Sequence, residues 1–490
     1  MPSDKHSESQ YTLYHATLVH TPSLGQIEIL PNMLLGVDCN GKIDFMEPFD
    51  AHKKSVHGSA TSYFRTVMEG DFTFVDYSSS PCSFLFPGFI DTHIHASQYP
   101  NVGIGSELPL LDWLKDYTFA LESKFCGNSP ETLEFAREIY TKVIEKTLTN
   151  GTTCASYFTT IGTETTKLFA DLLIEKGQRG LVGKVCMNDN PTFPTYEESM
   201  EDCLAGMHDL MDHCKTANAT VKNKNGLDMV TPIVTPRFAP VCSRELMKEL
   251  GSLSRECNLP VQTHISENLD EIKWVKSIFP ECESYTAVYD TNDLLGPSTI
   301  LAHAIHLDDQ ERKIVKERNC SISHCPTSNS FITSGEAPVK EYLYEDKINV
   351  SLGTDISGGY EQSILGVAKN SVLVSHHLSM GNEKDQRISV ADALYMATMG
   401  GAKACNLEGS LGSFEKGKCF DVQLVDVHSV NSNIDVFGFQ KPVSGEPDYE
   451  KKVSQLIHRW VFSGDDRNCV KVWCNGRLVV DKADPWVYVG

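Results

Sequence analysis

Residues 89–95 read FIDTHIH, an apolar run that ends in two histidines separated by one residue. Side chains alternate between the faces of a strand, so His93 and His95 would point the same way. Seven further runs rich in β-branched residues follow, separated by stretches with helical periodicity such as residues 130–148 and 243–257. The seven runs are TTCASYF (152–158), LVGKVCM (181–187), VTPIVTP (230–236), PVQTHIS (260–266), TILAHAI (299–305), SISHCP (321–326) and INVSLGTD (348–355).

Eight strands that alternate with helices are typical of an α/β fold of the (β/α)₈, TIM-like barrel type. We therefore expect residues 86–415 to form a barrel that carries the catalytic site. The alternative is a doubly wound open sheet. A dinucleotide-binding sheet of that kind would have a glycine-rich turn after its first strand, and the sequence has none.

Both ends of the chain have a different pattern from the middle. Short strand-like runs such as TLYHATLVH (12–20) and FDVQLVDV (420–427) are separated by turn residues, and Asn475-Gly476 is a hairpin signal. The sequence therefore predicts a composite β-sandwich domain from residues 1–85 and 416–490. Within the barrel, the polar residues 212–228 are predicted to form a surface loop.

Composition limits the possible partners. The chain has 43 Lys and Arg against 65 Asp and Glu, a formal net charge of −22, which disfavours nucleic acid and anionic lipid. No stretch approaches the roughly 18 consecutive apolar residues of a membrane span, and the first residues lack a signal-peptide core. The 16 cysteines include no C-x-x-C pair and suit reduced thiols. We expect a cytoplasmic protein, and a small, neutral substrate remains compatible with its charge.

Polar side chains recur where the predicted strands end. Such positions form the active site of a barrel, because all parallel strands finish at the same face. Neutral imidazoles with one carboxylate are ligands that suit Zn²⁺, and Fe²⁺ would accept the same set. An H-x-H pair alone is more often structural, but here several strand ends coincide. The candidate residues are His93, His95, His264, His303 and Asp355.

These residues also carry a resemblance to a known family. PGFIDTHIH (87–95), followed by His264, His303 and Gly353-Thr354-Asp355, resembles the pattern of the amidohydrolase family. Longer matches resemble its mononuclear-zinc branch that deaminates guanine. The resemblance implies hydrolysis of guanine to xanthine and ammonia, one Zn²⁺ per subunit and a homodimer. The longer matches are HIHASQY, LPLLDWL, TPRF, HISEN, SHCPTSN, GTDISGGY and SGDDRN.

The resemblance also implies roles for the ligands and the catalytic groups. It assigns His93, His95, His264 and Asp355 to the metal. Dinuclear members carry a bridging lysine on strand four, where this chain has Thr235-Pro236-Arg237-Phe238, so one metal is expected. Catalysis would fall to Glu267 as proton carrier, with His303 and Asp355 holding the attacking water.

For the substrate, the resemblance implies contacts with Gln98, Arg237, Phe238, Glu267 and Asp355. Arg237 would donate to the ring carbonyl, Gln98 would pair with the ring edge, and Phe238 would form an apolar wall. Ordinary packing remains open for all three: an ion pair for Arg237, a loop hydrogen bond for Gln98 and core burial for Phe238. Two other functions also remain open. One is another mononuclear amidohydrolase of adenosine, S-adenosylhomocysteine or triazine type, and the other is a non-catalytic scaffold.

Overall fold

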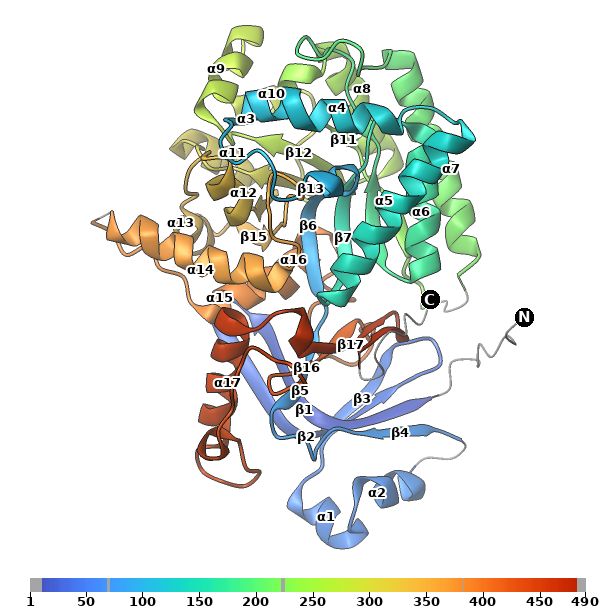
Figure 1. The fold of residues 1–490 in the computed structure, drawn as a ribbon, viewed down its shortest axis with the longest axis vertical. Coiled ribbons are helices and arrows are strands. Elements are labelled where there is room, and N and C mark those ends of the chain that lie inside the picture. The colour runs from blue at the N-terminus through green and yellow to red at the C-terminus, as the bar shows by residue number, and fades with distance from the viewer. Residues whose placement is uncertain (1–10, 68–70, 222–224, 382, 483–490) are drawn as a thin grey trace.

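A computed structural model describes residues 11–67, 71–221, 225–381 and 383–482 as a mixed α/β fold (Figure 1). Its centre is a set of parallel strands in two hydrogen-bonded groups and a short pair. The first group has the order β10-β8-β7-β6, the short pair is β11-β9, and the second group has the order β12-β13-β14-β15. The bounds are β6 (Phe89–His95), β7 (Thr152–Phe158), β8 (Arg179–Gly183), β9 (Val185–Cys186), β10 (Val230–Pro232), β11 (Thr235–Pro236), β12 (Val261–Ile265), β13 (Thr299–His303), β14 (Ser321–His324) and β15 (Asn349–Leu352).

Backbone contacts join the two groups at both of their ends. A parallel bridge links Val234, which lies between β10 and β11, to Val261, the first residue of β12. On the other side, the Asp355 amide donates to the His93 carbonyl at 2.8 Å, and the His95 amide donates to the Ile356 carbonyl at 3.0 Å. The segment after the last parallel strand is therefore held against the first one. The eight runs predicted from sequence all contain strands, and two of them are interrupted, by Lys184 and by residues 233–234.

Helices surround the parallel strands (Figure 1). All seven residues of β6 and of β7 are buried, as expected for strands covered on both faces. Serine N-caps begin several helices: Ser129 precedes α5, Ser199 precedes α7 and Ser243 precedes α8. The bounds are α3 (Leu110–Trp113), α4 (Phe119–Glu122), α5 (Pro130–Thr149), α6 (Thr163–Lys176), α7 (Met200–Ala219), α8 (Arg244–Cys257), α9 (Leu269–Ile278), α10 (Tyr285–Asp290), α11 (Asp309–Glu317), α12 (Pro326–Phe331), α13 (Val339–Tyr344), α14 (Ile364–Met380), α15 (Val390–Tyr395) and α16 (Gly401–Ala404).

The predicted loop at residues 212–228 is wrong in its first part. Helix α7 continues to Ala219, because Leu210, Cys214 and Ala217 recur at helical spacing on its buried face. The polar residues between these positions make the helical spacing difficult to recognise in the sequence. Residues 222–224 of the predicted loop lie outside the described residues. Among the helices of the described ranges, none combines the length and hydropathy required to cross a membrane.

The two ends of the chain meet in a second sheet, in the lower part of Figure 1. Its order is β18-β17-β16-β5-β1-β2-β3, with β4 paired to β1. The bounds are β1 (Thr12–Ser23), β2 (Gln26–Val37), β3 (Ile43–Pro48), β4 (Thr73–Asp76), β5 (Ser83–Pro87), β16 (Val422–Asp426), β17 (Cys469–Cys474) and β18 (Arg477–Asp481). Helices α1 (Ala51–His57), α2 (Ala60–Val67) and α17 (Tyr449–Ser463) accompany it.

The second sheet differs from the two sheets of the predicted sandwich. Its described strands hydrogen-bond as one sheet, because β1 pairs with β4 through residues 12–15 and meets β5 where Leu18 lies beside Leu85. The sheet also folds back over a shared core. The Tyr14 ring stacks on the Phe420 ring with centroids 4.8 Å apart, and it meets the Trp473 ring edge-on at 5.8 Å. Residues 1–10 and 483–490 of the predicted domain lie outside the described residues.

Trp460 of α17 packs where the second sheet passes into the parallel strands. Its side chain is 1 % exposed. It stacks on Phe89 of β6 with ring centroids 5.8 Å apart, and it meets Phe84 and Phe86 of β5 edge-on at 5.6 and 5.2 Å. Burial of a large aromatic side chain is among the strongest single contributions to stability. Trp460 therefore stabilises the interface between the second sheet and the parallel strands.

We expect Trp460→Ala to lower the free energy of unfolding by about 3–5 kcal/mol, because the substitution leaves a cavity between β5, β6 and α17. Urea denaturation followed by circular dichroism measures the change. Phe462→Ala, on the same helix at a position that is 38 % exposed, is the matched control and should change stability by less than about 1 kcal/mol. Equal effects of the two substitutions would contradict this account of the interface.

Candidate functional site

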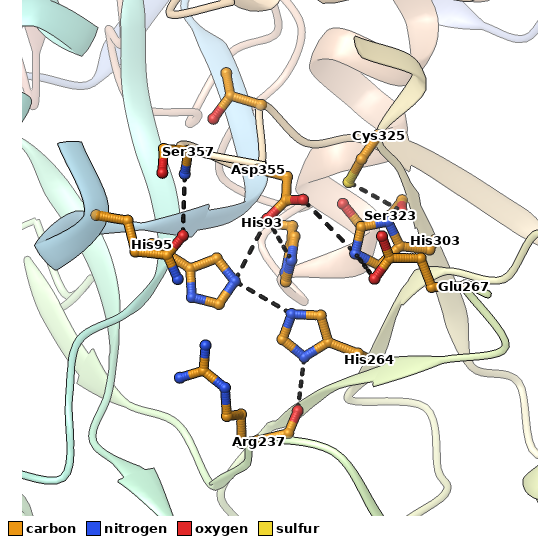
Figure 2. A network of polar contacts seen from close by, with 12 residues as sticks. His93, His95, Arg237, His264, Glu267, His303, Ser323, Cys325, Asp355 and Ser357 are labelled. Carbon is orange, nitrogen blue, oxygen red and sulfur yellow. Dashed lines mark hydrogen bonds and ion pairs between the residues drawn. The ribbon is translucent and has the colours of Figure 1, made fainter. Parts of the chain in front are cut away.

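Three histidines and one aspartate converge at the carboxyl ends of the parallel strands (Figure 2). His93 and His95 come from β6, and His264 comes from β12. Asp355 lies three residues beyond β15 rather than at its end, and the backbone bond to His93 places it. One potential ligand atom from each residue lies within 4.8 Å of all the others. The ligand set predicted from sequence is therefore brought together.

The geometry of this group fits one metal ion. His93 Nε2 and His95 Nε2 lie 3.2 and 3.4 Å from Asp355 Oδ1, and His95 Nε2 lies 3.1 Å from His264 Nε2. Ligands about 2.0–2.1 Å from a shared zinc would lie about 3.3 Å apart in a tetrahedral arrangement. In addition, His93 Nε2 is buried without a hydrogen-bond partner. Buried polar atoms are rarely left unpaired, so these nitrogens suit a cation.

Hydrogen bonds outside the group orient its members. His264 Nδ1 donates to the Arg237 carbonyl at 2.6 Å, which leaves the Nε2 lone pair free for a metal. Behind Asp355, the Asp91 carboxylate accepts bonds from the Thr354 amide at 3.1 Å and from the Thr354 hydroxyl at 2.6 Å. These bonds fix the loop that presents Asp355 to the three imidazoles.

Burial sets the protonation of the group. It lowers the pKa of His93, and it lowers the pKa values of His95 and His264 well below their usual range. Burial alone would raise the pKa of Asp355, but the His93 imidazole, with Nε2 3.2 Å from Oδ1, and the nearby His303 and His95 bring that pKa below its usual value. At neutral pH the site therefore offers neutral imidazoles and an ionised carboxylate, the protonation states that bind divalent metals.

Glu267 and His303 lie beside the metal-ligand group (Figure 2). His303 Nε2 lies 3.4 Å from Glu267 Oε2 and 3.8 Å from Asp355 Oδ2. His303 Nδ1 donates to Asn329 Oδ1 at 2.9 Å, and the Ser334 hydroxyl donates to Glu267 Oε1 at 3.2 Å. Burial raises the pKa of Glu267 to about 7. A carboxyl group with that pKa can both accept and release a proton near neutral pH.

A cavity opens onto these groups. Glu267, His303 and Asp355 line it together with the ligands His95 and His264. Its apolar walls are Leu110, Trp113, Leu114, Phe238 and Ile332, and its further lining residues are Gln98, Arg237, Glu271 and Gly358. The predicted substrate contacts Gln98, Arg237 and Phe238 thus all face the cavity. Their roles toward a substrate remain predictions.

Arg237 and Gln98 meet at a residue that sequence reasoning missed. Arg237 Nη1 donates to Glu122 Oε2 at 2.6 Å, so the ion pair considered as an alternative for Arg237 exists. Gln98 Nε2 donates to Glu122 Oε1 at 2.8 Å, and the Ser357 amide donates to Gln98 Oε1 at 3.2 Å. Arg237 and Gln98 can both line the cavity and bond Glu122 behind it, because each side chain has more than one N–H donor. The sequence does carry a signal for Glu122, which lies among apolar residues in TFALESKF (118–125). A buried acid is almost always paired, so a partner could have been sought for it.

Two other histidines near the strand ends stay outside the metal group. His306 Nε2 donates to the Ser334 carbonyl at 2.9 Å. His324 is buried at the end of β14, and burial lowers its pKa to about 3. Asn329 and Ser334, which hold His303 and Glu267, were also missed, because nothing in the local sequence marks a residue that contacts a catalytic group from 26 or 67 positions away.

Comparisons with known proteins agree with this arrangement. The amidohydrolase family model matches residues 84–479. A probable guanine deaminase from Schizosaccharomyces pombe is 43 % identical over 94 % of this chain and 82 % of its own length, and a guanine deaminase from Dictyostelium discoideum is 39 % identical over 95 % and 98 %. A crystal structure of guanine deaminase from C. acetobutylicum, with guanine bound in its active site, is 32 % identical, with a TM-score of 0.79 over 96 % of this chain and 99 % of that one. The chain therefore belongs to the amidohydrolase family and, within it, to the guanine deaminase family.

Proposed function

We propose that the protein is a hydrolase that converts guanine and water into xanthine and ammonia. The observation that carries this proposal is the placement of Glu267, with its pKa near 7, between the metal-ligand group and a cavity lined by Arg237. The similarity to guanine deaminases along nearly the whole chain supports it. A non-catalytic scaffold would gain nothing from buried imidazoles without partners, since each one costs stability.

The metal we propose is one Zn²⁺ per chain, held by His93, His95, His264 and Asp355. Three imidazoles and a carboxylate are a donor set that zinc accepts. Arg237 and Phe238 directly follow β11, where a bridging lysine would stand, which supports a single metal. When bound, the metal would lower the pKa of a water molecule from 15.7 to about 7 and so supply a nucleophile at neutral pH.

The chain's own residues supply the proton transfers. Glu267 takes a proton from the attacking water and delivers it to the ring nitrogen beside the attacked carbon. The oxygen of the water bonds to this carbon, and its second proton passes through Glu267 to the exocyclic amino group. The bond between the carbon and the exocyclic nitrogen then breaks, ammonia leaves, and the oxygen remains as the new carbonyl of xanthine. Burial alone would lower the pKa of His303, but Glu267 and Asp355 raise it above its usual value. With Nδ1 donating to Asn329, His303 directs Nε2–H toward these two carboxylates and holds the water between them.

The cavity favours a purine with a ring carbonyl. Arg237 carries only donors, so it can pair with a carbonyl oxygen and meets the amino group of adenine unfavourably. Gln98 offers both a donor and an acceptor to the ring edge, and Phe238 supplies an apolar wall. This arrangement favours guanine over the adenosine- and triazine-type alternatives.

Three further features belong to the proposal. We assign residues 86–415 to a closed (β/α)₈ barrel with the catalytic site, supported by the backbone bonds between β6 and residues 355–356. Residues 1–85 and 416–490 would form the composite β domain, as a single sheet folded over its aromatic core. The protein would act as a homodimer, as the resemblance implies, and in the cytoplasm, which suits its scattered cysteines as reduced thiols.

Purified protein should release ammonia from guanine and form xanthine, with a kcat/KM for adenine at least about 100-fold lower. A site built to bond one polar group rejects an analogue that lacks it by larger factors than this. Coupled ammonia detection with both bases measures the ratio. Comparable turnover of adenine would contradict the assignment of Arg237.

Glu267→Gln should keep the metal and lower kcat by about 10²–10⁴-fold, because the amide cannot carry a proton between water and the ring. Steady-state kinetics and metal analysis of the same sample separate the two effects. Asp270→Asn, at an exposed acid on the next helix, is the control and should keep wild-type kcat. Near-normal turnover of Glu267→Gln would remove Glu267 from the proton transfers.

Metal analysis should find about one zinc per chain, and removal by a chelator should abolish activity until Zn²⁺ is restored. His95→Ala should lower the metal content, because it removes one of the four donors. His324→Gln, a buried histidine outside the group, should retain full metal content. Iron in place of zinc would correct the metal identity, and full metal content in His95→Ala would contradict the ligand assignment.

A further inference from the structure

Glu122 accepts hydrogen bonds from three residues at the back of the substrate cavity. Its Oε1 atom accepts from Gln98 Nε2 at 2.8 Å, and its Oε2 atom accepts from Arg237 Nη1 at 2.6 Å and from the Tyr196 hydroxyl at 2.9 Å. Glu122 and Tyr196 are fully buried, and Gln98 and Arg237 are each 2 % exposed. Two of the three donors line the cavity, whereas Glu122 itself does not.

An ionised carboxylate can only accept hydrogen bonds, and this property fixes both side chains in front of it. The amide nitrogen of Gln98 must point toward Glu122, and the Ser357 amide holds the Gln98 oxygen from the other side at 3.2 Å. The amide of Gln98 therefore cannot flip. Arg237 is held by its charge-assisted bond to Glu122 and by the Phe119 ring, whose centroid lies 5.0 Å from the guanidinium carbon.

The segment that carries Glu122 also supplies three of the five apolar residues that line the cavity, Leu110, Trp113 and Leu114. Helix α3 contributes Leu110 and Trp113 to the lining, and α4 carries both Phe119 and Glu122. This part of the apolar wall and the anchor of the polar groups thus belong to one piece of chain between β6 and β7. A shift of this segment would move the donors and this part of the wall together.

We propose that Glu122 is a positioning residue that makes the cavity selective for a purine with a ring carbonyl. This inference rests on the proposed function. Glu122 never touches the base. It fixes the direction in which Arg237 presents its remaining N–H groups, and it balances the guanidinium charge so that a neutral base is preferred over an anion. A buried guanidinium without this partner would be free to reorient toward other acceptors or to recruit water.

Dissociation constants for guanine and for 2-aminopurine, which lacks the carbonyl oxygen, test the proposal. Calorimetric titration into the metal-loaded Glu267→Gln variant, which turns over slowly, provides both values. Adding Glu122→Gln should weaken guanine binding at least about tenfold, the effect of losing a well-placed bond to a charged donor. Binding of 2-aminopurine should change less than about threefold. Equal weakening of both ligands, or no change in either, would overturn the proposal.

Two controls distinguish positioning from general damage. In an Arg237→Ala background, Glu122→Gln should leave the ratio of the two dissociation constants unchanged, because the link through Arg237 is already gone. Asp421→Asn disrupts another buried pair, in which Arg179 Nε lies 3.6 Å from Asp421 Oδ2, and should leave the ratio at its parent value. A changed ratio in either control would show that the effect does not pass through Arg237.

Tyr196→Phe provides a second variant in case Glu122→Gln does not fold. It removes one donor from Glu122 Oε2 and changes no residue of the cavity lining. The dissociation constant of 2-aminopurine divided by that of guanine should therefore fall a few-fold, in the same direction as with Glu122→Gln. An unchanged ratio in folded Tyr196→Phe would overturn the proposal. If the wild-type protein, with Glu267 intact, binds guanine but does not deaminate it, the proposed function fails independently of Glu122.

Discussion

Burial of imidazoles without enough protein partners is the constraint on which the site depends. His93, His95 and His264 lie in the interior at the ends of β6 and β12, where burial lowers each pKa. A protein interior normally pairs its polar atoms, yet His93 Nε2 has no hydrogen-bond partner. A divalent cation resolves this cost, because it takes the lone pairs that burial has left free. Binding of a metal at this group would therefore be linked to folding of the strand ends.

The first and last parallel strands must meet for that group to exist. Asp355 reaches the imidazoles because its backbone bonds to His93 and because Asp91 holds Thr354 from behind. Both His303 and Asp355 have positive φ angles, 69° and 48°, a conformation that costs a non-glycine residue of order 1 kcal/mol. The surrounding bonds sustain this strain, which turns the two side chains toward the cavity.

The strands and the convergence of polar residues at their ends could be predicted from local rules in the sequence, whereas the choice of ligands among these residues came from the family resemblance. Side-chain alternation placed His93 and His95 on one face, and the shared edge of parallel strands brought His264 and Asp355 to them. Other features depend on contacts between distant segments. Glu122 lies 115 residues from Arg237, and no periodicity links the two. The folded single sheet at the chain ends likewise depends on β1 changing partners from β4 to β5.

The carboxylates of the site illustrate how one fold separates chemical roles. Asp355 faces several imidazoles, which bring its pKa below the usual value and keep it available to a metal. Glu267 is buried with one imidazole and the Ser334 hydroxyl beside it, and its pKa rises to about 7. Two acids whose environments push their pKa values apart can act as ligand and as proton carrier in the same cavity. The distinction follows from their neighbours, because the two side chains share the same functional group.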